Sequence, residues 1–259
     1  RAVIGAAEEM DAPVIVNHAQ VHQSVMDIRI IGPLMVEYAE AARVPVCVHI
    51  DHGFDKGYVL NAIRLGFTSV MYDRSSLPYE RNLAETAEFV RDAHLMDVTV
   101  EAELGIMPGV NEPGGGNERY IAQSPDNLTD VGQAGEFVEK TGVDALAVSI
   151  GSVHCVLRDE VDLKLDINRL RSLDAATGNC CLVMHGGSGV RDDQIRLAIA
   201  NGISKINFYT WMGIAPAPEI AKFIAANTDG KVYFHDIANL AQAVMKERCK
   251  QAIQVFLNR

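Results

Sequence analysis

The sequence predicts an α/β protein of the TIM (β/α)8 barrel type. Short apolar stretches rich in Val, Ile and Leu run without polar alternation, as expected for strands that are buried on both faces. Stretches with apolar residues at helical spacing separate them, and this alternation predicts a parallel sheet with helices outside. The length of 259 residues also fits one such barrel, which typically needs about 250 residues.

The predicted helices and strands alternate along the whole chain. Residues 1–11 carry apolar residues at helical spacing, and residues 13–17 (PVIVN) follow as a short, branched strand. The same criteria predict further strands at residues 44–50, 69–73, 98–104, 145–150, 180–185 and 205–209. They predict further helices at residues 28–43, 56–65, 79–94, 131–141, 167–176, 191–201, 216–226 and 237–257. Asp55 stands where helix 56–65 would have its N-cap.

The strand count leaves two architectures to compare. The seven predicted strands are one fewer than a barrel needs, so we expect a first strand before Arg1. The alternative is an open, doubly wound sheet of seven strands, but residues 4–6 lack the Gly-x-Gly-x-x-Gly turn of dinucleotide-binding sheets. We therefore expect residues 1–259 to form a single barrel domain that includes the C-terminal helices.

Residues 106–127 interrupt the alternation of helices and strands. This stretch contains three prolines and a Gly-Gly-Gly run at residues 114–116, which excludes a regular element. Loops of this length in a compact domain are commonly functional. The sequence therefore predicts a long mobile loop beside the active site.

Charge and cysteine content restrict the class of protein. The net charge is −11 and no cluster of Lys or Arg occurs, so the chain lacks the basic surface that nucleic acid or an anionic membrane would require. The five cysteines are odd in number and lie mostly in apolar stretches, which suits a reducing compartment better than a disulfide framework. No apolar run is long enough for a membrane span, and no leader-type apolar segment opens the chain. We expect a soluble, cytoplasmic protein.

Polar residues gather at the ends of the predicted strands, where the active site of a parallel barrel lies. These residues are Asp51, His52, Glu101, Glu103, Ser152, His154, His185 and Asn207. Three histidines from three strands can converge there, and three imidazoles with an open fourth position are typical of a catalytic zinc site. Each histidine alone could equally make a structural hydrogen bond. We expect that bonding for His49, His94 and His235, and a solvated loop for His18 and His22.

A glycine-rich turn follows the strand that ends at His185. Residues 186–189 read Gly-Gly-Ser-Gly, and a helix pattern begins directly after them. Backbone N–H groups of such a turn can converge on an anion, and the following helix adds a partial positive charge. The turn is therefore a candidate phosphate site, which would let an acidic protein bind an anionic substrate.

The strand-end motifs occur in a fixed order. They are HIDHG at residues 49–53, VEAELG at 100–105, LAVSIG at 146–151 followed by His154, HGGSG at 185–189 and KIN at 205–207. In this order they resemble the motifs of the class II, metal-dependent ketose-bisphosphate aldolases, with the fructose- and tagatose-bisphosphate enzymes as the nearest types. The resemblance covers nearly the whole chain and implies a β/α barrel.

The resemblance implies a zinc-dependent aldol lyase. Such an enzyme reversibly cleaves a ketose phosphate or bisphosphate into dihydroxyacetone phosphate and an aldehyde, through an enediolate that the metal stabilises. By resemblance, Zn²⁺ would be held by His52, His154 and His185, and Glu103 would lie near an alternative metal position. The family is commonly dimeric or tetrameric, so the resemblance also implies a homo-oligomer.

Catalytic and substrate-binding roles also come from the resemblance. Asp51 would exchange the proton of the C4 hydroxyl, and Glu112 in the long loop would handle the proton on the other fragment. A monovalent cation is a further expected ligand where the backbone approaches the phosphate. The substrate and its phosphate would lie against Gly186, Gly187, Ser188, Asn207, Tyr209 and Thr210.

Several residues depart from the family pattern. Cys155 follows the second histidine in place of glycine, Tyr209 replaces Asp or Ala, Arg74 stands at a usually small position, and residues 17–20 replace a turn containing Ser or Thr. The metal ligands and Asp51 are retained while the pocket has changed, so we expect an aldehyde partner other than the usual phosphorylated triose. The alternatives are a metal-dependent epimerase, and a catalytically diverged member that acts as a sugar-phosphate-binding or assembly protein.

Overall fold

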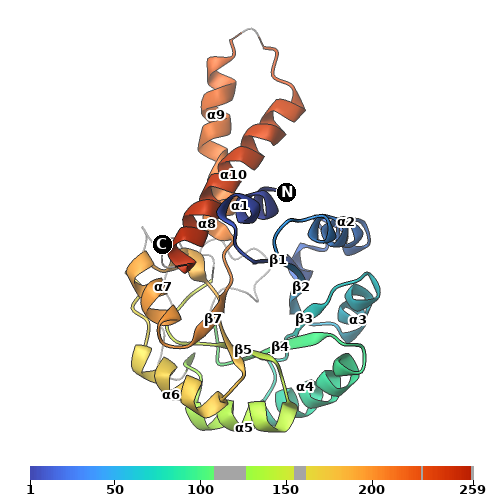
Figure 1. Cartoon of the computed structure of the whole chain (residues 1–259), viewed down its shortest axis with the longest axis vertical. Helices are drawn as coiled ribbons and strands as arrows, with labels where there is room; N and C mark the ends of the chain where they lie inside the picture. Colours follow the sequence, from blue (N-terminus) through green and yellow to red (C-terminus); the bar gives the residue numbers. More distant parts are fainter. Residues whose placement is uncertain (108–126, 155–161, 229, 258–259) are drawn as a thin grey trace.

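A computed structural model describes residues 1–107, 127–154, 162–228 and 230–257. Its seven strands form one parallel sheet in which the strand order follows the sequence. Each strand pairs with the next in the chain, and the sheet curls so that its two edges approach each other (Figure 1). The strands are β1 (Val14–Ala19), β2 (Val46–Gly53), β3 (Ser69–Tyr72), β4 (Thr99–Leu104), β5 (Ala145–Val148), β6 (Cys181–Met184) and β7 (Ile203–Ile206).

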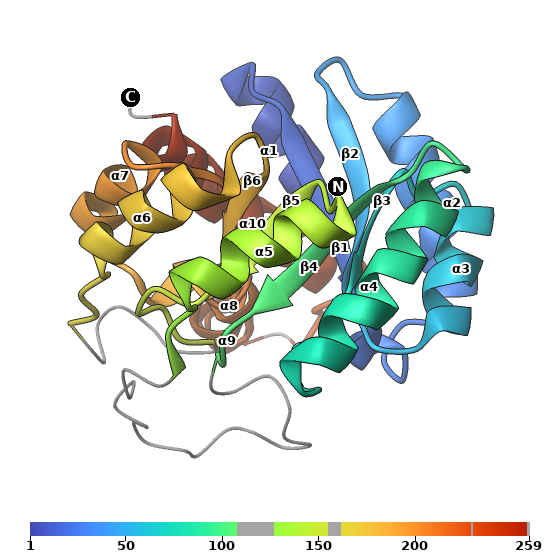
Figure 2. The same ribbon diagram turned by 90° about the horizontal axis from the view of Figure 1, so that it is seen from below.

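Helices surround the curled sheet on its outer side. Those between and beside the strands are α1 (Ala2–Met10), α2 (Ile28–Glu40), α3 (Lys56–Arg64), α4 (Tyr79–His94), α5 (Val131–Thr141), α6 (Ile167–Thr177) and α7 (Asp192–Ile199). Figure 2 shows α4 and α5 covering the outer side of the strands. The chain then forms α8 (Thr210–Ile214), α9 (Pro216–Ala226) and α10 (Phe234–Phe256). Helix α9 and the first part of α10 project from the barrel as a hairpin (Figure 1), whereas the end of α10 packs on the barrel with Cys249, Ala252 and Val255 buried.

The predicted fold class is confirmed. A doubly wound sheet would reverse its strand order part-way and carry helices on both faces, so that alternative is wrong. Within the described residues, β1 and β7 are the two edges of the sheet and do not pair with each other. The strand expected before Arg1 stays a prediction.

Element boundaries differ from the predictions at a few functional places. Strand β2 continues three residues beyond Ile50, and β7 ends at Ile206, so Asn207 lies after its strand. Helix α10 begins at Phe234, earlier than predicted, because Tyr233 and Asp236 form a capping box ahead of its apolar stretch. The short helix α8 had no periodicity long enough to predict it.

The apolar core lies between the strands and the helices. Phe67, Phe89 and Phe137 are fully buried there, next to the outward-facing Val48 and Ile50 of β2. Side chains alternate along a strand, so the residues between and after these two point into the barrel. The barrel interior is therefore polar on β2, whereas its outer side is apolar. In the described part of the chain, no helix combines the length and the apolar character that crossing a membrane requires.

Aspartate side chains begin several of the outer helices. Asp55 accepts a hydrogen bond from the backbone N–H of Tyr58 at 2.7 Å, which confirms its predicted capping role for α3. Asp130 caps α5 in the same way, through the N–H of Gln133 at 2.8 Å. These bonds satisfy donors that the first turn of a helix would otherwise leave unpaired.

The cap of α5 gives a stability prediction. The substitution Asp130→Ala should lower the free energy of unfolding by about 1 kcal/mol, because it leaves a backbone donor at the start of α5 without its partner. Urea denaturation of both proteins measures this difference. The control is Glu139→Ala, an exposed position on the same helix that makes no cap. An equal loss in both variants would contradict the capping role.

Candidate metal centre and active site

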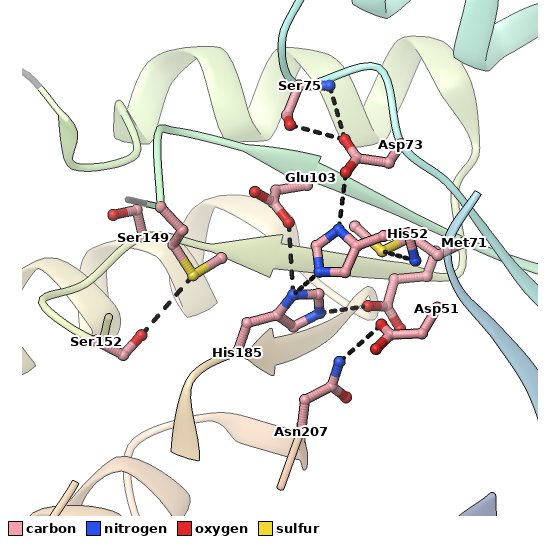
Figure 3. A network of polar contacts seen from close by, with 12 residues as sticks. Asp51, His52, Met71, Asp73, Ser75, Glu103, Ser149, Ser152, His185 and Asn207 are labelled. Carbon is pink, nitrogen blue, oxygen red and sulfur yellow. Dashed lines mark hydrogen bonds and ion pairs between the residues drawn. The ribbon is translucent and has the colours of Figure 1, made fainter. Parts of the chain in front are cut away.

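Three histidine rings meet at the end of the barrel where the strands finish. His52 comes from β2, His154 follows β5 and His185 follows β6. Their ring centroids lie 4.8–5.6 Å apart, and one nitrogen from each ring lies within 4.8 Å of the others. The nearest pair of nitrogens, His185 Nδ1 and His52 Nε2, is 3.1 Å apart, as Figure 3 shows. The three predicted zinc ligands are therefore brought together.

A bulge in β2 allows neighbouring residues to face the same site. The pairing of β2 with β3 shifts register between Ile50 and Gly53, and His52 has a left-handed backbone with φ of 47°. Regular alternation would turn Asp51 and His52 to opposite faces of the sheet. The bulge re-aims His52 toward the barrel mouth without turning Asp51 away from it. A left-handed residue other than glycine is strained, so the surrounding contacts must hold it in place.

The protonation of these rings suits cation binding. Burial lowers the pKa of His154 to about 4, and burial together with the nearby His52 holds the pKa of His185 well below its ordinary value. Both rings are then neutral at pH 7 and keep lone pairs. Burial would also lower the pKa of His52, but the hydrogen bond to Asp73 and the charge of Asp51 raise it to about 9. The site therefore favours positive charge at this ring, which a divalent ion would supply.

Carboxylates hold the outer nitrogens of two rings. Asp73 Oδ2 lies 2.8 Å from His52 Nδ1, and Glu101 Oε1 lies 3.0 Å from His185 Nε2. Asp73 is itself fixed, because its Oδ1 accepts hydrogen bonds from the backbone N–H and the hydroxyl of Ser75 at 3.0 and 2.7 Å. Such carboxylate–histidine pairs orient metal-binding imidazoles. The buried Nε2 of His154 has no hydrogen-bond partner among the described residues, and its lone pair is available for an ion.

The donor set fits a transition-metal ion with imidazole and carboxylate ligands. Three imidazoles form one group, and His52, Asp73 and Glu103 form a second group whose ligand atoms also lie within 4.8 Å of one another. Burial, and then the charge of Asp73, raise the pKa of Glu103 well above its ordinary value. A nearby cation would reverse that effect and favour the carboxylate. Glu103 Oε2 lies 3.5 Å from His185 Nδ1, so this carboxylate is next to the histidine cluster.

Asp51 lies at the same end of the barrel, held by a residue from the opposite edge of the sheet. Asn207 Nδ2 donates a hydrogen bond to Asp51 Oδ1 at 2.9 Å, and Lys205 Nζ donates to Asn207 Oδ1 at 2.7 Å. Figure 3 shows the contact of Asn207 with Asp51 beside the histidines, and together with the contact from Lys205 it fixes the orientation of this carboxylate. A carboxylate fixed in this way is chemically able to accept a proton.

The glycine-rich turn lies against the start of α8. Gly186 has φ of 72°, and a Cβ there would lie 2.5 Å from the carbonyl oxygen of Val153, so glycine is required. The hydroxyl oxygen of Ser188 accepts from the backbone N–H groups of Tyr209 and Trp211, both at 3.3 Å. The turn is thus next to the second group of predicted substrate and phosphate residues, which are Asn207, Tyr209 and Thr210. A 3-10 turn stands at Gly187–Gly189, and α7 begins later than predicted, at Asp192.

The whole chain also matches a known family. Residues 1–259 match the family model described as "Fructose-bisphosphate aldolase class-II". The chain belongs to this family. A fructose-bisphosphate aldolase of Streptococcus pyogenes is 37% identical over 99% of this chain and 87% of its own length. The crystal structure of the YdjI aldolase of Escherichia coli superposes with a TM-score of 0.80 and 32% identity, covering 98% of this chain and 85% of that chain.

The other residues that the sequence singled out are Glu112, Cys155, Tyr209 and Arg74. Glu112 and Cys155 lie outside the described residues. Tyr209 is 59% exposed, and its ring lies 5.5 Å from that of His22 at the edge of the site. Arg74 does not reach the histidines, because it pairs with Glu85 at 2.6 Å and contacts the ring of Tyr72.

One histidine prediction was wrong, and one site residue was missed. His18 was expected in a solvated loop, yet it lies in β1 and is 6% exposed, because that strand runs to Ala19. Asp73 was counted as the last residue of a strand and so was not considered as a site residue. It follows β3 directly, so the strand-end rule that found the histidines would have found it too. His49 makes the structural hydrogen bond expected of it, with Ser69 Oγ at 2.8 Å.

Proposed function

We propose that this class II aldolase is a zinc-dependent aldol lyase that cleaves a ketose phosphate or bisphosphate into dihydroxyacetone phosphate and an aldehyde. The observation that carries the proposal is the convergence of three imidazole nitrogens within 4.8 Å of one another, with Asp51 at the same end of the barrel. The set of three histidines with an open position is typical of catalytic zinc. We extend the proposal to a cytoplasmic homo-oligomer, as expected from the cysteine content and the family.

Each residue of the site would have a distinct role in the cleavage reaction. The ion, when bound, would act as a Lewis acid toward the ketone oxygen and stabilise the negative charge left by carbon–carbon cleavage. His52, His154 and His185 would hold it, with Asp73 and Glu101 orienting two of the rings. Asp51 would accept the proton of the C4 hydroxyl, because Asn207 leaves its second carboxylate oxygen free of that hydrogen bond. The substrate and its phosphate would lie against Gly186, Gly187, Ser188, Asn207, Tyr209 and Thr210.

The edge of the site supports an altered aldehyde partner. Tyr209, which contacts Ser188 of the glycine-rich turn through its backbone, and His22 place two aromatic rings 5.5 Å apart. Gln20 at the same end of β1 is engaged by the backbone N–H groups of Phe54 and Asp55, at 2.7 and 3.1 Å. These groups form an aromatic and amide-lined edge, which suits a hydroxylated aldehyde better than a second phosphate. We propose that the aldehyde lacks the phosphate of the usual triose.

Metal analysis and a substrate series test this function together. We expect one equivalent of zinc in the purified protein, loss of cleavage on chelation, and recovery when zinc returns. Fructose- and tagatose-bisphosphate should be cleaved less efficiently than ketose 1-phosphates with an uncharged far end. Full efficiency on either bisphosphate would contradict the altered aldehyde partner. Binding of dihydroxyacetone phosphate without zinc would favour the binding protein, and epimerisation without cleavage would favour the epimerase.

A further inference from the structure

Lys205 lies inside the barrel beneath the histidine cluster. Its side chain is 10% exposed, and that of its partner Glu101 on β4 is 2% exposed. The ammonium Nζ lies 2.8 Å from Glu101 Oε2 and 2.7 Å from Asn207 Oδ1. Lys205 and Asn207 are two positions apart at the end of β7, so both side chains point to the interior. One buried cation therefore contacts two different polar groups of the site.

The first contact leads to a metal ligand. Glu101 uses Oε2 for Lys205 and Oε1 for His185 Nε2, at 3.0 Å. A carboxylate accepts hydrogen bonds and cannot donate them, so His185 must carry its proton on Nε2. Its Nδ1, which faces His52 at 3.1 Å, then keeps its lone pair for an ion. Lys205 balances the buried charge of Glu101, which an apolar surrounding would otherwise disfavour.

The second contact leads to the proposed base. The ammonium group only donates hydrogen bonds, so the atom of Asn207 that faces Lys205 must be its carbonyl oxygen. The amide nitrogen of Asn207 then faces Asp51 and donates to its carboxylate at 2.9 Å. The two ends of an asparagine amide are easily exchanged in an ambiguous environment. Lys205 Nζ at 2.7 Å, together with a longer contact from Asn17 Nδ2 at 3.5 Å, holds the Asn207 amide in the orientation that donates to Asp51.

We propose that Lys205 is a positioning residue that couples the metal ligand His185 to the base Asp51. It acts on His185 through Glu101 and on Asp51 through Asn207. We call the path from Lys205 through Glu101 to His185 the Glu101 arm, and the path through Asn207 to Asp51 the Asn207 arm. The Asn207 arm rests on the proposed function, because it concerns the role of Asp51, whereas the Glu101 arm depends only on metal binding. A purely structural ion pair would affect the stability of the barrel but not the ion or the base, so the two roles are distinguishable.

The substitution Lys205→Met removes the charge and all donors while keeping the length of the side chain. We expect the zinc dissociation constant, measured by chelator competition, to rise about 10- to 100-fold, as for other residues that support metal ligands. The absorption spectrum of the Co²⁺-substituted protein should change as well, because His185 loses its fixed ring orientation. At saturating zinc both proteins hold the ion, and the kcat for cleavage should still be lower in the variant, because Asp51 is no longer fixed through Asn207.

Two variants separate the arms. Asn207→Ala should lower kcat while leaving the zinc dissociation constant and the Co²⁺ spectrum unchanged, because it cuts the path to Asp51 and leaves the path from Lys205 through Glu101 to His185 intact. Glu101→Gln should weaken zinc binding, because it cuts the path to His185. The matched control is Lys222→Met on α9, whose side chain is 73% exposed and pairs only with Glu219 in the described part of the chain. It should match the unchanged protein in every measurement.

The outcomes decide the proposal. Unchanged zinc affinity, Co²⁺ spectrum and kcat in Lys205→Met would overturn it. If that variant does not fold, the double variant Glu101→Gln with Lys205→Met removes both buried charges, and its kcat should fall below that of Glu101→Gln alone. Equal kcat values would overturn the Asn207 arm. A wild-type protein that binds zinc but cleaves no ketose phosphate would refute the proposed function, and the zinc measurements would still test the Glu101 arm.

Discussion

Replacing His154 by alanine should remove most of the bound zinc and lower the rate of cleavage by about a thousandfold or more. A metal ion acting as a Lewis acid contributes several kcal/mol to transition-state stabilisation. Each 1.4 kcal/mol or so corresponds to a factor of ten in rate. His154 is the most informative of the three ligands, because its buried Nε2 makes no hydrogen bond within the described residues. Its loss therefore leaves no structural partner unsatisfied there.

Zinc content, cleavage rate and thermal unfolding should be measured on the same preparations. The control is His235→Ala in the α9–α10 hairpin, where the side chain is 72% exposed and pairs with Asp236. This variant should keep its zinc and its rate. A second variant, His185→Ala, should show the same losses but also a lower unfolding temperature, because it leaves Glu101 buried without one of its partners. Full activity of His154→Ala would contradict the metal centre.

The architecture and the histidine cluster were predictable because parallel strands carry their functional residues to one end. Unbroken apolar runs identify buried strands in the sequence. The residues that follow these strands lie at one end of the barrel, whatever their distance in sequence. That reasoning brings His52, His154 and His185 together without any knowledge of the side-chain packing. The glycine-rich turn after β6 was predictable as well, because several glycines follow the strand. The structure agrees, since Gly186 has a positive φ that other residues rarely adopt.

Other features of the site depend on register and could not be predicted. The bulge that turns both Asp51 and His52 to the site breaks the alternation on which strand predictions rely. Similarly, the contact of Lys205 with Glu101 joins β7 to β4 across the barrel interior. Sequence spacing contains no information about which residues meet there, because that depends on the closure of the sheet. The buried Lys205 was therefore part of a recognised motif with no role attached to it.

Asp51→Asn should lower the rate of carbon–carbon cleavage by about 10²- to 10⁴-fold, the usual contribution of a general acid or base. The amide has nearly the same shape as the carboxylate but cannot accept the proton of the C4 hydroxyl. Zinc content should not change, because Asp51 is not one of the grouped ligands in the described residues. Proton exchange on dihydroxyacetone phosphate, followed by NMR in deuterated water, should persist, since that step occurs on the other fragment.

The nearby Asp55 provides a matched control for this variant. Asp55→Asn changes charge in the same way only four positions along the chain, but Asn caps helices about as well as Asp, so α3 should keep its N-cap. Its cleavage rate and stability should stay close to those of the unchanged protein. Equal losses in both variants would indicate that the negative charge at the end of β2 and the start of α3, and not a base at Asp51, supports the reaction. If Asp51→Asn alone loses proton exchange, Asp51 transfers the proton of dihydroxyacetone phosphate. Its assignment to the C4 hydroxyl would then be wrong.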